Sequence, residues 1–161
     1  MFAVGDNVVY PMHGAGVVEA IEERIFEARP TKYLVLSMFL GNMKVHIPLE
    51  NVEKVGLRPV SDQQELKRIA AVLQERSESN LRSITWNRRF TIYLDKMKSG
   101  NVLELAEVIR ILSVQDHEKK LSTGERRLLG SARQILASEL MVAKGSDMKV
   151  AEAWIDKFLE A

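Results

Sequence analysis

The sequence predicts an α+β protein in which a small antiparallel β-barrel precedes an all-α bundle of about five helices. Two observations lead to this expectation. Over the first sixty of the 161 residues, short β-rich runs alternate with turn residues. From Ser61 onward, apolar residues instead recur at the three- and four-residue spacing of amphipathic helices. This change of period near Val60 divides the chain into a strand-rich domain of residues 1–60 and a helical domain of residues 61–161.

Four strands and one helical turn account for the first half. Gly41 and Asn42, between the last two strands, are the tight-turn signal of a hairpin. Four or five short antiparallel strands in about sixty residues predict a small barrel of the SH3 or Tudor type. Such a domain buries only about 60% of its chain surface, so we expect contacts with a neighbouring domain or a partner to stabilise it. The predicted strands are residues 7–10, 16–24, 31–38 and 43–47, and the helical turn is residues 48–52.

The second half begins with two helices separated by a polar segment. Ser61 and Gln64 form a predicted capping box for the first helix. Residues 75–80 are polar and are predicted as a loop. The second helix starts at Trp86 and ends at residues 98–100, where lysine, serine and glycine give the usual stop.

Three further helices each follow a residue that can cap the first turn, and the long middle one also has a glycine stop. The boundary signals are Asn101 with Glu104, Ser122 with Glu125, Gly145, and Ser146 or Asp147.

Composition excludes several classes of function. The chain has no cysteine, which rules out disulfides, thiolate metal sites and cysteine nucleophiles. His13, His46 and His117 share no metal-ligand spacing, and no segment combines a nucleophile, a base and an orienting group. The glycines after His13 precede a β-branched run rather than a helix, so a phosphate-binding loop is not expected. We therefore predict neither an enzyme, a metal site nor a cofactor. With no apolar run near the ~20 residues of a membrane span, we expect a cytoplasmic protein.

Positive charge is concentrated in two stretches of the helical half, although the net charge is only +1. Residues 1–60 hold six Lys/Arg against seven Asp/Glu, which gives −1. Residues 76–100 hold six against two, which gives +4, and residues 118–133 hold five against two, which gives +3. Solvated helix faces often look the same, but two such stretches in one half favour a phosphate-binding surface.

Trp86 stands beside Arg88 and Arg89 where the second helix begins, with Thr85 as the predicted N-cap. A tryptophan ahead of the apolar stripe is poorly placed to join the core face of its own helix. Apolar wedges flanked by basic residues enter the DNA minor groove and unstack a base step in several proteins. The alternative is that Trp86 packs against a neighbouring helix. For Trp154, spaced with other apolar residues of the last helix, a core position is expected.

Seven segments with a distinctive order and spacing run through nearly the whole chain. In the first half they are V-G-D-N-V-V-Y-P-M-H-G-A-G-V-V-E-A-I (4–21), Y-L-V-L (33–36), I-P-L-E-N (47–51) and V-G-L-R (55–58). In the second half they are W-N-R-R-F (86–90), S-G (99–100) and L-S-T-G-E-R-R-L-L-G-S-A-R-Q-I-L (121–136).

In these segments the chain resembles the bacterial CarD/CdnL-type transcription regulators, and its first half is similar to the polymerase-binding module of transcription-repair coupling factors. The resemblance implies a Tudor-like domain that binds the RNA polymerase β subunit and a helical domain that contacts promoter DNA. Arg24 and His46 fall at polymerase-contacting positions. Some relatives have arginine where this chain has His46, and a neutral histidine cannot make the bidentate pair that arginine makes.

The resemblance also implies that Trp86 wedges into the minor groove at the upstream edge of melted promoter DNA. Arg88 and Arg89 match basic residues beside it, and Arg126 matches a basic position in the second cluster. We expect these side chains, with Arg127 and Lys96, to contact phosphates with little sequence preference.

The leading hypothesis is thus a monomeric factor, associated with the nucleoid through RNA polymerase, that stabilises the open promoter complex. A protein–protein adaptor without DNA contact is the alternative, and Trp86 would then be an interface hot spot. A DNA-compacting protein is disfavoured by the net charge of +1.

Overall fold

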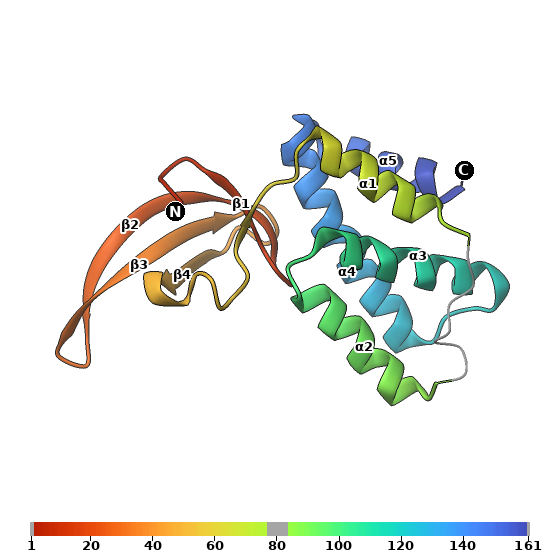
Figure 1. The fold of residues 1–161 in the computed structure, drawn as a ribbon, viewed down its shortest axis with the longest axis horizontal. Coiled ribbons are helices and arrows are strands. Elements are labelled where there is room, and N and C mark those ends of the chain that lie inside the picture. The colour runs from red at the N-terminus through yellow and green to blue at the C-terminus, as the bar shows by residue number, and fades with distance from the viewer. Residues whose placement is uncertain (1, 77–83, 161) are drawn as a thin grey trace.

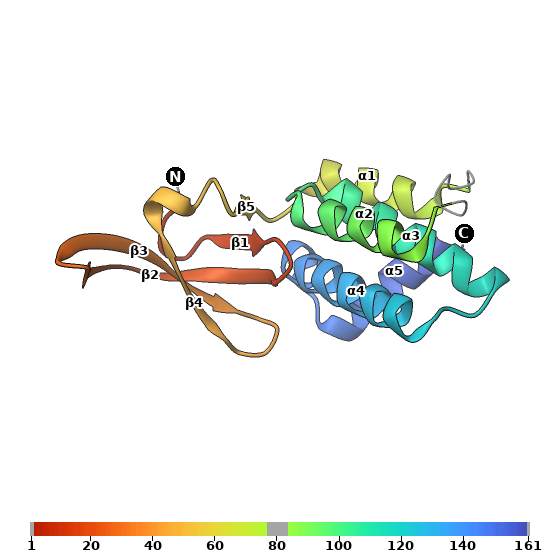
Figure 2. The ribbon, with the colours of Figure 1, turned by 90° about the horizontal axis from the view of Figure 1, so that it is seen from below.

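The computed structural model describes residues 2–76 and 84–160. A curved sheet and a helical bundle lie side by side, joined at one end of each (Figures 1 and 2). The predicted α+β architecture is confirmed: a five-stranded antiparallel sheet is followed by five helices in the described residues.

The strands pair in the order β4-β3-β2-β1-β5, so β4 and β5 are the two edges of the sheet. Four of the five strands were predicted. The fifth pairs with Val8 and Val9 of β1, and it was missed because two residues including a proline form no recognisable pattern. The elements are β1 (Asn7–Tyr10), β2 (Gly14–Phe26), β3 (Arg29–Met38), β4 (Lys44–Pro48), the predicted helical turn at Leu49–Asn51, and β5 (Arg58–Pro59).

β2 and β3 form a longer hairpin than predicted, and it bends away from the bundle (Figure 1). Its turn is made by Glu27 and Ala28, which both adopt left-handed backbone conformations with φ of 50° and 61°. Because neither is a glycine, no turn could be predicted there from the sequence. The turn predicted at Gly41 and Asn42 is confirmed, with φ of 75° and 51°.

One predicted helix cap is wrong. The first helix begins one residue later than expected, and Asp62 caps it by accepting a hydrogen bond from Glu65 N at 2.8 Å. Ser61, the predicted cap, instead donates to the buried Glu139, which lies 78 residues away in the chain. The five helices are α1 (Gln63–Gln74), α2 (Trp86–Lys98), α3 (Val102–Glu118), α4 (Thr123–Lys144) and α5 (Met148–Glu160).

The other helix boundaries agree with local sequence signals. The Ser122–Glu125 capping box is present with both of its hydrogen bonds, and Gly145 ends α4 in the left-handed conformation. Of the two alternatives for α5, Asp147 is the residue that accepts a hydrogen bond from the first turn, from Val150 N at 2.8 Å. In the predicted loop 75–80, residues 75 and 76 follow α1 without helical structure, and residues 77–80 lie outside the described part of the chain.

Each half has its own apolar core. The sheet core includes the fully buried Leu36 and Val8. The bundle core is built around Tyr93 of α2, together with side chains of α1, α3, α4 and α5. Trp154 packs against the edge of the bundle core and is half-buried, close to its expected position.

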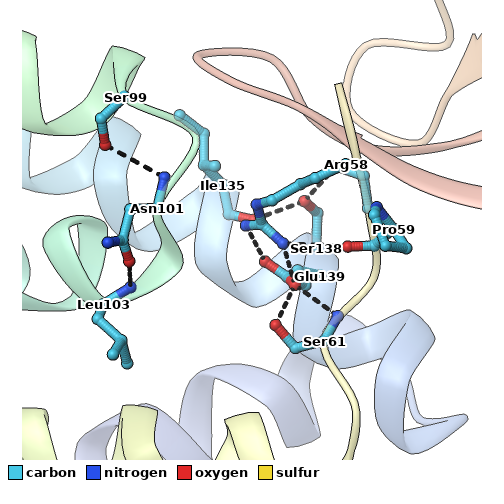
Figure 3. A network of polar contacts seen from close by, with 10 residues as sticks. Arg58, Pro59, Ser61, Ser99, Asn101, Leu103, Ile135, Ser138 and Glu139 are labelled. Atoms are coloured by element: carbon cyan, nitrogen blue, oxygen red, sulfur yellow. Dashed lines mark hydrogen bonds and ion pairs between the residues drawn. The ribbon is translucent and has the colours of Figure 1, made fainter. Parts of the chain in front are cut away.

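A polar network joins the two cores (Figure 3). Arg58 of β5 donates two hydrogen bonds of 2.7 Å to the two carboxylate oxygens of Glu139 in α4, whose side chain is 0% exposed. Ser61 N and Oγ donate to the same carboxylate at 2.8 and 2.6 Å. Close by, Ala15 N of β2 donates to Ser138 Oγ at 2.9 Å. The sheet is therefore fixed to the C-terminal half of α4 by directional contacts as well as by apolar packing.

Candidate nucleic-acid interface

The first turns of α2 and α4 lie together at the end of the bundle remote from the sheet (Figures 1 and 2). Trp86 begins α2, and Ser122 caps α4. The two basic stretches of the sequence therefore approach each other here. Two helix N-termini add partial positive charge from their free backbone N–H groups, which favours anions at this end.

Trp86 is half-buried at the start of α2. Its ring centroid is 5.4 Å from that of Phe90, one turn along the same helix. The indole also rests against Gly124 in the first turn of α4, where a Cβ atom would lie only 3.2 Å from Trp86 Cζ2. The side chain thus combines features of the two sequence-based alternatives, because it packs on a neighbouring helix yet keeps part of its surface exposed.

Arg88 and Arg89 have different environments. The Arg88 side chain is exposed, as a phosphate contact requires. The Arg89 side chain is only 19% exposed, and its guanidinium carbon lies 5.8 Å from the centroid of the Trp86 ring. Arg89 Nη2 is also 3.8 Å from Glu125 Oε2. Arg89 is therefore placed to hold the tryptophan, and less of it faces solvent than the sequence suggested.

Glu125 is a buried carboxylate within this basic end. It accepts hydrogen bonds from Ser122 N at 3.2 Å, from Ser122 Oγ at 2.9 Å and from Gln115 Nε2 of α3 at 2.7 Å. Burial raises the pKa of Glu125, but the hydrogen bonds from Ser122 and Gln115 and the charge of Arg89 outweigh it, so the pKa is lowered. The carboxylate thus stays ionised opposite Arg89.

Tyr93 lies next to this ion pair, with its side chain wholly inside the bundle core. Burial raises the pKa of the Tyr93 hydroxyl, the charge of Arg89 lowers it, and that of Glu125 raises it; the net shift is upward. Tyr93 therefore stays neutral and contributes to the core beneath the basic end.

The second basic stretch contributes exposed side chains at the start of α4. Arg126 is exposed, although its Nη2 donates to Leu121 O at 3.2 Å, and Arg127 is exposed as well. Lys119 and Lys120 are exposed just before the helix. These groups, with Arg88, make up the solvated positive charge near Trp86.

Lys96 does not join that group. It lies ten residues beyond Trp86 on α2, roughly 15 Å along the helix axis, toward the sheet. Its Nζ is 3.2 Å from Glu107 Oε2 of α3. The sequence reasoning grouped Lys96 with the arginines by charge alone and had no means to detect its acidic partner. Arg133 is likewise paired, with Asp156 of α5 at 2.7 Å.

Arg24 and His46, the predicted polymerase contacts, share one acidic neighbour on the sheet. Arg24 Nη2 lies 3.0 Å from Glu22 Oε2, and His46 Nε2 lies 3.9 Å from the same oxygen. β3 separates the strands that carry the two residues, and Glu22 is the contact that links their side chains. Both are exposed, and β4, which carries His46, is an edge strand.

Within residues 2–76 and 84–160, no group of three or more His, Asp or Glu side chains is arranged to hold a metal ion. No helix in that part of the chain has the length and apolar character needed to cross a membrane.

Sequence reasoning missed three residues of this architecture. Glu139 falls three and four residues after the core positions Leu136 and Ile135, so a charge on the apolar face was a detectable signal. Glu125 was identified only as a capping residue, because its contact with Arg89 is tertiary. Gly124 had no signal, since its proximity to Trp86 depends on how α2 and α4 pack.

Comparisons with known proteins cover both halves. Residues 2–61 match the family model described as the CarD-like/TRCF RID domain, an RNA polymerase-interacting domain. Residues 68–156 match the model described as the CarD C-terminal domain. The chain is also similar to the protein named "Putative transcription factor YdeB" of Bacillus subtilis, with 43% identity over 145 residues that cover 90% of this chain and 94% of that protein. The resemblance inferred from the sequence is confirmed: the chain belongs to the CarD family of transcription factors, and its N-terminal half is an RNA polymerase-interacting domain.

Proposed function

We propose that this protein binds the β subunit of RNA polymerase through its sheet and stabilises the open promoter complex by inserting Trp86 into the minor groove at the upstream edge of the melted DNA. The observation that carries the proposal is the half-exposed Trp86, seated between α2 and α4 with exposed arginines close by, at the end of the molecule remote from the sheet.

The sheet supplies two means of docking. β4 is an edge strand, and an edge presents backbone N–H and C=O groups that can pair with a partner strand. His46 lies exposed on this strand, and Arg24 lies exposed on β2. Because Glu22 already contacts both side chains, an acidic group on the polymerase would have to compete with Glu22 for them. Backbone pairing would then supply much of the affinity, and the charges would set register and specificity.

Trp86 favours melted DNA for an energetic reason. A protein shifts the balance between closed and open promoter DNA only by binding the open form better. Inserting a side chain into intact duplex costs a few kcal/mol of unstacking per step, whereas the fork has already lost that stacking. A wedge therefore gains more at the fork than in closed duplex.

The proposed mechanism also includes phosphate contacts by exposed arginines and attachment of the sheet to polymerase. Arg88, Arg126 and Arg127 can contact phosphates, which orients the wedge without reading sequence. Attachment of the sheet to polymerase raises the effective concentration of this weak DNA-binding end at one place. A nearly neutral protein can in this way act at many promoters.

The test separates the two contacts of the full-length chain. Binding to isolated β subunit and to fork-junction DNA is measured for the wild type, Trp86→Ala and Arg24→Glu. Trp86→Ala should weaken fork binding alone, and Arg24→Glu should weaken β-subunit binding alone. Wild-type protein that binds β subunit and shows no affinity for fork DNA would favour the protein–protein adaptor and refute the proposal.

A further inference from the structure

The contact between Trp86 and Gly124 depends on the absence of a side chain at position 124. A Cβ atom built there would lie 3.2 Å from Trp86 Cζ2, 3.9 Å from Cη2 and 4.0 Å from Cε2. The first of these distances is tighter than ordinary van der Waals contact, so any larger residue would displace the indole or the helix.

Backbone geometry gives no reason for glycine at this position. Gly124 lies in the first turn of α4 and does not have the left-handed conformation of Gly145, which ends the same helix. An alanine would be the better helix former at an ordinary helical position. Gly130, six residues further along α4, provides a comparison, because a Cβ there would have no atom within 4 Å.

We propose that Gly124 is a positioning residue for Trp86, and that it sets the orientation in which the indole is presented to DNA. Arg89 provides a second contact with the ring, and Glu125, the neighbour of Gly124, holds that guanidinium in place. We call Gly124, Arg89 and Phe90 the tryptophan seat. A side chain held in its binding orientation loses less conformational entropy on insertion than a free one, which is the benefit of preorganisation.

This inference rests on the proposed role of Trp86 at the fork, and it predicts that filling the seat impairs DNA binding without unfolding the protein. The variants are Gly124→Ala and Gly124→Leu, with Gly130→Ala and Gly130→Leu as matched controls in the same helix. All are made in a Trp154→Phe background, which leaves Trp86 as the only tryptophan. The measurements are affinity for fork-junction DNA, Trp86 fluorescence with acrylamide quenching, binding to β subunit and urea unfolding.

Trp86→Ala should weaken fork binding roughly 5- to 150-fold, the range expected for loss of one stacked aromatic contact. Gly124→Leu should approach that loss, and Gly124→Ala should show a smaller one with a shifted Trp86 emission. The Gly130 variants should match their parent, and β-subunit binding should be the same for every variant.

Suppose that the position-124 and position-130 variants bind fork DNA with equal affinity, while Trp86→Ala still shows its loss. The proposed positioning role of the tryptophan seat would then be wrong. The proposed function would then stand. Unaltered fork binding by Trp86→Ala would refute the proposed function, and the inference with it. If Gly124→Leu fails to fold, Gly124→Ala against Gly130→Ala decides the matter, because both replace glycine with a better helix former.

Discussion

Arg58 of the short strand β5 and Glu139 in the C-terminal half of α4 form a bidentate ion pair, with two N–O distances of 2.7 Å, across the junction of the sheet and the bundle. The Glu139 side chain is 0% exposed and that of Arg58 is 19% exposed. A buried carboxylate is tolerated only where hydrogen bonds replace its hydration, and Ser61 supplies the remaining two. The pair thus fixes the half that binds polymerase relative to the half that carries Trp86.

Removing one member of this pair should destabilise the protein strongly. We expect Arg58→Met to lower the free energy of unfolding by about 3–5 kcal/mol, because it leaves the Glu139 charge buried without its partner. The double variant Arg58→Met/Glu139→Met should lose less than the sum of the two single losses, since it leaves no unpaired charge. Urea unfolding of the four proteins gives the coupling energy. Strictly additive losses would show that the pair contributes nothing as a pair.

The two helix starts at the basic end of the bundle should respond differently to loss of their caps. Ser122 Oγ accepts from Glu125 N and is part of a full capping box, so Ser122→Ala should cost about 0.5–2 kcal/mol. The Thr85 side chain makes no cap hydrogen bond, so Thr85→Ala should cost much less. Chemical denaturation of both variants is the measurement. Equal losses would mean that the cap hydrogen bond at Ser122 has no net effect on stability.

Glu125 should make the free energy of unfolding depend on pH in the acid range. Its pKa in the folded protein is lowered from the ordinary value of 4.5. A depressed carboxyl pKa adds stability that is fully present above the unfolded pKa and is lost as pH falls through the folded pKa. The advantage of the wild type over Glu125→Gln should therefore be constant near neutral pH and shrink as the pH falls below 4.5. Unfolding measured across this range checks it, and a difference that stays constant or grows toward low pH would contradict the assignment.

The salt dependence of DNA binding should distinguish exposed from paired basic residues. Arg88→Ala should reduce the slope of log affinity against log salt by about 0.9, the loss of one phosphate contact on duplex DNA. Lys96→Ala should leave the slope unchanged, because Lys96 is paired with Glu107 away from Trp86. Titrations on two unrelated duplexes at several salt concentrations test both. A strong preference for one duplex that disappears in Arg88→Ala would indicate base readout and refute the backbone-contact model.

Local signals in the sequence were sufficient for most of the fold. The hairpin turn at Gly41–Asn42 and the capping box at Ser122 are determined by adjacent residues, so both could be predicted and both are present. The cap of α1 was assigned one residue too early because Ser61 is drawn to Glu139, 78 residues away. β5 exists only through its pairing with β1. These features depend on packing between distant segments, which periodicity does not encode.

In the candidate site, too, some features follow from neighbouring residues and others depend on the packing of distant segments. The position of Trp86 at a helix start, and the exposure of Arg88 and Arg126, follow from the sequence pattern and are observed. The inward position of Arg89 and the pairing of Lys96 depend on α4 and α3, respectively. Charge counts therefore identified the basic end of the molecule, but they did not show which of its cations are solvated.

The most direct test of the proposed function is the lifetime of the open promoter complex with wild-type protein and with Trp86→Ala. The variant should bind polymerase normally but shorten the lifetime by roughly 5–150-fold relative to wild type, which corresponds to about 1–3 kcal/mol of coupling between wedge and open DNA. Urea unfolding should show that both proteins are folded under the assay conditions. Equal lifetimes for the two folded, polymerase-bound proteins would contradict the proposal that Trp86 stabilises the open complex.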